Sequence, residues 1–425
     1  MEYIKDDVPI TFITGGAGTG KSYTIRQYIK ENSKDKNIAV TASTGIAAFN
    51  IGGQTIHSYL QLDAEQFKKG ASFKDMKGAF FAKANVKKNK YKLSTLQDSF
   101  RYIINANTII IDEISMINAK TLDYIDYLLR AIKNDKNKYK GTYNAPPFGG
   151  KKIIIVGDLF QLPPVEGDFF FNSQIWKECK HQIINLTKSY RQKDDTQFTD
   201  VLNRIRVGNQ TEDDIKYINN KIPKNPNEQF WENKMYLMAY NEELGRCNTK
   251  FLNKLEGQEV EFIATDELYD IKYTSKFIVD KTLKLKQNAK VMLLKNLDVS
   301  KGLVNGAIGY CLDFIDDYIL CDFNGQEVRI EKEKFTEKDG DIEIATRWQY
   351  PLKLAYGLTV HKSQGQTLND IVLYEPNHMK QAGQFYTAIS RTKKYEMLHI
   401  TNTFEKSNLT TNQIVKRWCL DEGLI

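Results

Sequence analysis

The sequence predicts an α/β protein built on doubly wound parallel sheets, with a small antiparallel β insertion in its second half. Short apolar runs rich in β-branched residues alternate with helix-like segments, and such runs are typical of strands covered on both faces of a parallel sheet. Between residues 260 and 348, short strand-like runs are separated by turn dipeptides, which favours hairpins. At 425 residues, the chain is long enough for two or three domains.

A glycine-rich turn separates the first predicted strand, at 10–13, from the first predicted helix, at 23–31. Its glycines allow a tight fold, and its N–H groups can face phosphate oxygens at the N-terminus of the helix. Lys21 can reach the β- and γ-phosphates, and the Ser22 hydroxyl can ligate Mg²⁺. The predicted nucleoside-triphosphate site comprises Gly15, Gly16, Ala17, Gly18, Thr19, Gly20, Lys21 and Ser22.

Three further apolar runs extend the first predicted sheet, at 38–40, 109–111 and 153–156. Between the last two runs, Leu122, Ile125 and other apolar residues recur at helical spacing, which predicts an amphipathic helix. Polar residues directly follow these last two runs. Because ligands of doubly wound sheets bind at the carboxyl ends of strands, these residues are candidates for a site.

Asp112 and Glu113 follow the run at 109–111, and after a phosphate-binding loop such a pair indicates nucleotide hydrolysis. Asp112 is expected to hold Mg²⁺ through water, and Glu113 to orient and deprotonate the attacking water. Gln161 follows Gly157-Asp158 after the next run, where it could sense the γ-phosphate through a hydrogen bond that hydrolysis breaks. Taken alone, Gln161 would be an ordinary loop residue.

A second α/β set is predicted after residue 190. It consists of strand-like runs at 235–240, 352–356 and 371–374, with a helix over 241–255. The antiparallel insertion contains strand-like runs at 307–310, 318–321 and 327–330, with turns at Asp316-Asp317 and Asn324-Gly325-Gln326.

Two arginines of the second half, Arg191 and Arg391, are candidates for the catalytic site. Charge that develops on a transferred phosphoryl group needs a cation supplied across a cleft. An arginine from a second domain supplies it only when the cleft is closed, which couples nucleotide state to domain motion. Without the other motifs, each would be a surface arginine.

Residues 61–100 interrupt the α/β alternation. From Gln66 to Lys92 there are nine lysines and one acidic residue, with aromatic residues interleaved. Lysines neutralise phosphates and aromatic rings stack on bases, so one interpretation is a nucleic-acid contact. A solvated surface hairpin with a small core of its own is an equally good interpretation, and the sequence leaves both open.

The composition favours an intracellular soluble enzyme, cytoplasmic in a bacterial or phage setting. The net charge of +7 is compatible with a polyanionic partner. Five cysteines without a C-x-x-C pair argue against disulfides and zinc, and fit a reducing compartment. The sequence contains no run of eighteen apolar residues, so it predicts no membrane span. The first residues do not resemble a signal peptide.

Several segments resemble the ordered motifs of superfamily-one helicases: 41–48 (TASTGIAA), 54–58 (QTIHS), 112–116 (DEISM), 157–165 (GDLFQLPPV) and 361–367 (HKSQGQT). The GDLFQLPPV segment, with PFGG at 147–150 and LVNG at 303–306, resembles the petite-integration-frequency (PIF) helicases. The resemblance runs in order from about residue 10 to residue 400. RecD-like and phage Dda-like helicases are the nearest alternatives.

This resemblance implies two RecA-like domains with ATP between them, and 5′-to-3′ movement on single-stranded DNA with unwinding of duplexes. Many members of the family also unfold G-quadruplexes. The implied domains are a first RecA-like domain (1–60 and 101–188), a strand-separating wedge (61–100), a second RecA-like domain (189–259 and 349–425) and an SH3-like β insertion (260–348). The implied ligands are ATP, Mg²⁺, and single-stranded DNA with its forks and junctions; we expect a monomer in solution and no membrane partner.

The resemblance also implies residue roles. Gln161 would be the γ-phosphate sensor, Arg191 and Arg391 the arginine fingers, and Gly365 part of a motif that links the ATP site to DNA. Residues expected along the DNA path are Ser43, Thr44, Thr55, His57, Thr359, His361 and Lys362. Such side chains suit phosphate contacts, which position a strand without reading its sequence. For the two histidines, packing inside the protein is the alternative.

The chain departs from the family pattern before its first strand. Family members carry an L-x-x-x-Q segment there, whose glutamine reads adenine, whereas the residues before the strand at 10–13 include no glutamine. The preference for ATP over other nucleoside triphosphates is therefore left open.

Three functions remain open from the residues. The first is an ATP-driven DNA helicase, and the second is a nucleic-acid-stimulated ATPase that translocates or remodels complexes without separating strands. Deleting 66–92 should abolish unwinding yet spare stimulated ATPase if the first is right. The third is a binding module with a vestigial nucleotide site, which measurable ATP turnover would eliminate.

Overall fold

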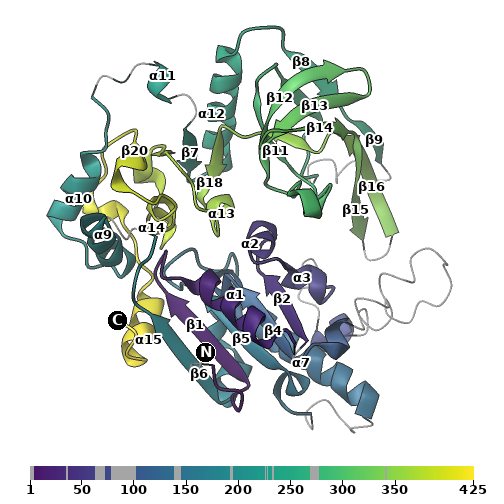
Figure 1. Cartoon of the computed structure of the whole chain (residues 1–425), viewed down its shortest axis with the longest axis vertical. Coiled ribbons are helices and arrows are strands. Elements are labelled where there is room, and N and C mark those ends of the chain that lie inside the picture. Colours follow the sequence, from purple (N-terminus) through teal and green to yellow (C-terminus); the bar gives the residue numbers. More distant parts are fainter. Residues whose placement is uncertain are drawn as a thin grey trace. The chain divides into compact units, whose positions relative to one another are not determined.

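The computed structural model describes residues 4–34, 37–62, 72–77, 102–137, 145–191, 195–224, 226, 228–231, 234–268, 277–339 and 342–425. The chain forms two compact units (Figure 1). The first unit comprises Met1–Lys224, Ser363–Asp370 and Glu375–Ile425, and the second comprises Asn225–Lys362 and Ile371–Tyr374. Most of the predicted insertion at 61–100 lies outside the described residues. The domain boundaries implied by the resemblance stay a prediction.

The first unit contains a six-stranded sheet in the order β3-β2-β4-β5-β1-β6, and its strand pairs are parallel. Its strands are β1 (Ile10–Gly15), β2 (Ile38–Ala42), β3 (Gln54–Thr55), β4 (Thr108–Asp112), β5 (Lys152–Gly157) and β6 (His181–Leu186). The predicted doubly wound α/β fold is confirmed. β3 and β6 were not predicted, because β3 has only two residues and β6 mixes polar with apolar residues along a half-buried strand.

Helices cover this sheet (Figure 1). The α-helices of the unit include α1 (Lys21–Asn32), α2 (Gly45–Asn50), α3 (Ile56–Tyr59), α7 (Ala119–Asn137), α8 (Gln174–Glu178), α9 (Thr196–Arg206), α10 (Glu212–Asn219), α14 (Gln384–Ile389) and α15 (Gln413–Asp421). Short 3₁₀ helices are η1 (Ile114–Met116), η3 (Pro147–Gly150), η4 (Phe170–Asn172), η7 (Pro376–His378), η8 (Tyr395–Met397) and η9 (Lys406–Asn408), and β20 (Leu398–Ile400) is a further strand. The predicted amphipathic helix is α7, whose apolar face is fully buried.

Aromatic packing fixes the last helix of the chain against the sheet. The Phe12 ring of β1 lies edge-on to Phe170 with 5.0 Å between centroids, and Trp418 of α15 stacks on Phe171 at 4.6 Å. Asn185 of β6 donates a hydrogen bond to the carbonyl of Leu424, just beyond α15. The C-terminal segment therefore packs beside β1 and β6, although more than two hundred residues separate them along the chain.

The second unit contains the parallel strands β18 (Gly357–Thr359), β7 (Met235–Met238) and β19 (Ile371–Leu373), with β7 in the middle. The helices α11 (Glu228–Trp231), α12 (Asn241–Lys254) and α13 (Val360–Ser363) flank these strands in the chain. One strand was wrongly assigned from the sequence. The run at 352–356 forms β17 (Leu352–Leu354), which pairs antiparallel with β11 (Lys290–Leu293), whereas β18 takes the place beside β7. Both stretches are short and apolar, so local pattern cannot distinguish them.

The predicted antiparallel β insertion is confirmed. A five-stranded sheet has the order β14-β13-β12-β11-β17, with β12 (Ile308–Ile315), β13 (Tyr318–Phe323) and β14 (Gln326–Glu331) joined as hairpins. Asn324 and Gly325 have φ angles of 57° and 80°, which the two-residue hairpin turn requires. The other elements are β8 (Val260–Ile263), β9 (Thr265–Leu268), β10 (Thr282–Leu285), η6 (Val299–Lys301), β15 (Glu333–Asp339) and β16 (Ile342–Gln349).

No helix in the described part of the chain is long and apolar enough to cross a membrane.

Candidate active site

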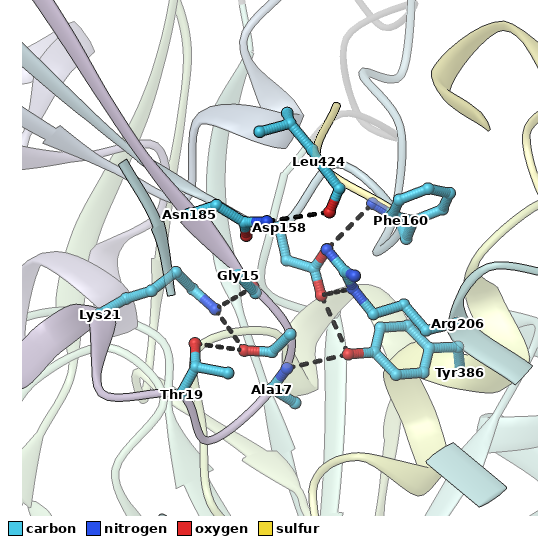
Figure 2. Close-up of polar contacts among 11 residues, drawn as sticks. Gly15, Ala17, Thr19, Lys21, Asp158, Phe160, Asn185, Arg206, Tyr386 and Leu424 are labelled. Carbon is cyan, nitrogen blue, oxygen red and sulfur yellow. Dashed lines mark hydrogen bonds and ion pairs between the residues drawn. The ribbon is translucent and has the colours of Figure 1, made fainter. Parts of the chain in front are cut away.

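The glycine-rich turn connects β1 to α1 and wraps around the side chain of its own lysine (Figure 2). Lys21 Nζ donates hydrogen bonds to the carbonyls of Gly15 and Gly16, each at 2.8 Å, and Thr19 Oγ1 donates to Gly16 at 2.9 Å. Gly20 has a φ of 90°, a conformation that glycine adopts without strain. The turn therefore holds the Lys21 ammonium at its centre, where phosphate oxygens would replace the two carbonyls.

Carboxylates from the ends of β4 and β5 gather around Lys21. Burial lowers the pKa of Lys21, and the negative charges of Asp158, Glu113 and Asp112 oppose this lowering. The polar residues that follow these two strands were candidates for a site from the sequence, and the structure places them close together. Three acidic groups and one ammonium group thus share a buried region at the carboxyl edge of the sheet.

Asp112 and Glu113 occupy the last position of β4 and the residue after it. Glu113 has a φ of 54°, and its N–H donates a 2.8 Å hydrogen bond to Asp112 Oδ1. Burial, and then the charge of Glu113, raises the pKa of Asp112. The ionised form of Asp112 is thus destabilised by burial and by a neighbouring negative charge. A divalent cation bound here would balance this negative charge. Carboxylate and hydroxyl oxygens are ligands that Mg²⁺ prefers, so Asp112 and Ser22 fit this ion.

Replacing Asp112 by asparagine should stabilise the nucleotide-free protein, because the buried negative charge is removed while Oδ1 can still accept from Glu113. The folded state raises the pKa of Asp112, so the wild-type protein loses stability as pH rises from about 4 towards that raised value. The Tm of Asp112→Asn should therefore exceed that of the wild type by about 2–4 °C at neutral pH and match it in acid. A thermal unfolding series without nucleotide or metal measures this; equal stability at all pH values would contradict it.

Arg191 and Arg391 lie near each other and near Glu113. Arg191 Nη1 donates to the carbonyl of Ser390 at 2.8 Å, and burial, followed by the charge of Arg391, lowers the pKa of Arg191 to about 10. Arg391 is 2% exposed, and its guanidinium donates to backbone carbonyls, among them that of Thr387 at 2.9 Å. Neither guanidinium donates a hydrogen bond to a carboxylate among the described contacts, and the negative charge of Glu113 acts on both.

Among the buried amide oxygens that have no hydrogen-bond partner in the described structure, two belong to segments of the candidate site. One is Gln161, whose Oε1 is unpartnered although the residue is only 5% exposed. The backbone carbonyl of Gln161 lies against Gly383, which precedes α14. A Cβ added at Gly383 would come within 2.3 Å of this carbonyl oxygen. The other is Gln364. Buried amide oxygens usually find a partner, so these two unpartnered oxygens are unusual features of the site.

Sequence reasoning missed two residues that hold Asp158. Arg206 Nε lies 3.0 Å and 3.2 Å from the two carboxylate oxygens, and the Tyr386 hydroxyl donates to Oδ2 at 2.9 Å (Figure 2). The same hydroxyl accepts a 2.9 Å hydrogen bond from the N–H of Ala17 in the glycine-rich turn. Burial raises the pKa of Asp158, but the charges of Arg206 and Lys21 more than offset this and lower it overall. The only sequence signal was Asp158 itself, an acid at the end of an apolar strand that requires a cationic partner.

Arg206→Ala should destabilise the protein by about 3–5 kcal/mol, because it leaves the carboxylate of Asp158 buried without its closest cation. Arg206 also stacks on the Phe160 ring at 4.7 Å. Arg417 on α15 offers the control: its side chain is 80% exposed and that of its partner Asp421 61%, so this ion pair should contribute about 1 kcal/mol or less. Chemical unfolding of both variants measures the difference, and equal losses would show that the Arg206 pair is no stronger than a surface pair.

The expected DNA-path residues are divided between the two units. In the first unit, Ser43 donates its N–H to the carbonyl of Asp112 at 3.0 Å, so the end of β2 lies directly beside the acidic pair. Thr44 Oγ1 and Thr55 Oγ1 cap α2 and α3 by accepting hydrogen bonds from Ala47 and Ser58. A capping hydroxyl keeps its own proton, which can still be donated to a phosphate.

The remaining DNA-path candidates differ in burial: the two histidines are half-buried, Thr359 is buried and Lys362 is exposed. Burial lowers the pKa of His57 on α3, and likewise that of His361 on α13. Lys362 follows His361, and its pKa is lowered by burial and by the charge of Lys353. Thr359 ends β18 in the second unit, and Gly365 has a φ of 78° in the first. The structure thus brings the predicted nucleotide-site residues together, whereas the DNA contacts stay a prediction.

Two family models match the chain. The model of the PIF1-like helicase family matches residues 3–216, which is half of the chain, and the model of the 2B domain of DNA helicase Pif1 matches residues 273–314. The ATP-dependent DNA helicase PIF1 of Saccharomyces cerevisiae is 36% identical over 72% of this chain and 34% of its own length. The chain spans about a third to three fifths of the curated relatives that it matches.

Solved structures match almost the whole chain. The crystal structure of Pif1 helicase from Candida albicans has a TM-score of 0.81 and 31% identity, with 97% of this chain and 95% of that chain covered. The Pif1 helicase from Bacteroides in complex with ADP-AlF3 and ssDNA has a TM-score of 0.78 and 28% identity, with 99% and 95% covered. These similarities cover both the parallel sheets and the antiparallel insertion.

Proposed function

Because this chain belongs to the PIF1-like helicase family, we propose that it hydrolyses ATP to move 5′ to 3′ along single-stranded DNA and to separate duplex DNA at forks. The observation that carries the proposal is the assembly around Glu113 of Lys21, Arg191 and Arg391 from distant parts of the chain. Relatives that are named ATP-dependent DNA helicases, and a similar structure bound to ADP-AlF3 and ssDNA, support the proposal.

In the proposed reaction, the N–H groups of the glycine-rich turn and the Lys21 ammonium bind the phosphates. Glu113 accepts a proton from the attacking water, and Gln161 monitors the γ-phosphate. Arg191 and Arg391 stabilise the charge that builds up on the transferred phosphoryl group, which is the largest contribution such a site can make. Mg²⁺, held by Ser22 and Asp112, would neutralise charge on the phosphate oxygens when bound.

The proposed strand contacts use hydroxyl, imidazole and ammonium groups from both units. In the first unit these are Ser43, Thr44, Thr55 and His57, and in the second Thr359, His361 and Lys362. Contacts of this kind hold the backbone in register without reading the sequence. Because they displace counterions, binding to single-stranded DNA should weaken steeply as the salt concentration rises.

A forked duplex with a single 5′ tail or a single 3′ tail tests the proposal, with and without ATP. ATP-dependent unwinding from the 5′ tail alone is the expected result. Unwinding only from the 3′ tail would keep the motor and overturn the direction. If neither substrate is unwound while single-stranded DNA still stimulates ATP turnover, the chain is a translocase that does not separate strands.

A further inference from the structure

Gln364 contacts the proposed general base directly. Its Nε2 donates hydrogen bonds to Glu113 Oε2 and to Ser115 Oγ, each at 3.1 Å. The amide must face the carboxylate with its NH₂ group, because the oxygen would be repelled. Gln364 is 1% exposed, and Ser115 is fully buried. No water can therefore compete for these hydrogen bonds from the side of Gln364.

The rest of the Gln364 side chain is poorly satisfied. Its Oε1 is buried without a hydrogen-bond partner in the described structure. A buried amide oxygen without a partner favours any conformation in which it finds one. Half of the hydrogen-bonding capacity of the Gln364 amide therefore contributes nothing to holding it against Glu113 and Ser115.

The backbone beside Gln364 lies between the acidic pair and α2. The carbonyl of Gly365 accepts a 3.1 Å hydrogen bond from Asn50 Nδ2, at the end of α2. A Cβ added at Gly365 would lie 3.3 Å from Ala47 Cβ and 3.5 Å from Glu113 Oε1. Any displacement of this segment therefore changes the surroundings of the Glu113 carboxylate.

Gln364 also follows closely on residues that we expect to contact DNA. His361 and Lys362 precede it on the same short stretch of chain, and Thr44 caps α2, whose Ala47 lies beside Gly365. A hydrogen bond weakens steeply when its length or angle is disturbed. A small displacement of the backbone around Gln364 is therefore enough to break its 3.1 Å hydrogen bond to Glu113.

We propose that Gln364 is a positioning residue that restrains Glu113 while no strand is bound and releases it when a strand engages the preceding residues. In the restrained state, Oε2 of Glu113 is occupied by the amide and its carboxylate is fixed in orientation. Release frees this oxygen to accept a proton from the attacking water. The inference rests on the proposed function, because it assigns to Gln364 the link between DNA binding and ATP turnover.

The test is ATP turnover of Gln364→Ala and Gln364→Met with and without a single-stranded thymidine oligonucleotide. The methionine variant keeps the volume of the buried side chain and removes only the amide. If Gln364→Ala fails to fold, Gln364→Met still tests the role of the amide. We expect turnover without DNA to rise about fivefold or more in both variants, as for an ordinary coupling between two sites. The stimulation by DNA should fall by the same factor, and DNA affinity should not decrease, because the strand no longer has to break the contacts of Gln364.

Two further variants sharpen the test. Ser115→Ala removes the second acceptor of the amide and should raise DNA-free turnover less than Gln364→Met does; the double variant should equal Gln364→Met, because both act through one contact. Asn369→Ala changes an exposed amide in the same segment and should behave as the wild type.

The possible outcomes separate the two proposals. If wild-type turnover is not stimulated by DNA, the proposed function is overturned, and the role of Gln364 with it. If the wild type is stimulated and both Gln364 variants respond to the same degree, only the role of Gln364 is overturned. If the variants lose DNA-stimulated turnover without gaining DNA-free turnover, Gln364 supports Glu113 instead of restraining it, and the inference is wrong.

Discussion

Lys21→Ala is expected to lower ATP turnover by about a hundredfold to a thousandfold, the effect of removing one preorganised charge from a phosphoryl-transfer site. In the structure, the Lys21 ammonium is held by two carbonyls of the glycine-rich turn at 2.8 Å. Its charge also acts together with those of the buried acidic residues at the ends of β4 and β5. Alanine can neither bind phosphates nor balance these carboxylates.

Steady-state ATPase measurements test this expectation, together with anisotropy of a labelled single-stranded oligonucleotide. Some DNA binding should remain, because the proposed strand contacts use other residues. Lys30→Ala is the matched control: it removes an exposed lysine from the last turn of the same helix and should leave turnover unchanged. Comparable hydrolysis in Lys21→Ala and in the wild type would refute the assignment of the nucleotide site.

Glu113→Gln is expected to lower turnover by about a hundredfold or more, within the range for loss of a general base. Glutamine has nearly the same shape and can occupy the same backbone conformation, but its amide cannot accept a proton from water. The nucleotide should still bind, since Lys21 and the turn are unchanged. The loss should therefore appear in kcat rather than in the affinity for ATP.

Single-turnover hydrolysis and a nucleotide-binding assay separate these two effects for Glu113→Gln. Glu178→Gln changes an exposed glutamate on α8 and serves as the control. Normal turnover in Glu113→Gln would mean that another group activates the water, and the role proposed for Gln364 would fall with it. Loss of nucleotide binding would instead assign Glu113 to binding.

Local pattern predicted the elements whose causes are local. The strands β1, β2, β4 and β5 were predicted because strands buried on both faces need continuous apolar runs, which a reader can see in the sequence. The hairpin turn at Asn324 and Gly325 was predicted because only a few residue types adopt positive φ there. The failures were equally physical. β17 was assigned to the wrong sheet, because short apolar strands do not encode their partner.

A glycine-rich turn after a strand, acidic residues after buried strands and a β insertion were all recognisable from local sequence. Each of these depends on neighbouring residues, so a few positions suffice to specify it. The side chains that meet around the turn become visible only in the folded chain. Arg206 pairs with Asp158 across 48 residues, Gln364 reaches Glu113 across 251, and Tyr386 reaches Ala17 across 369. Such contacts depend on the packing of many intervening elements, and no local periodicity records them.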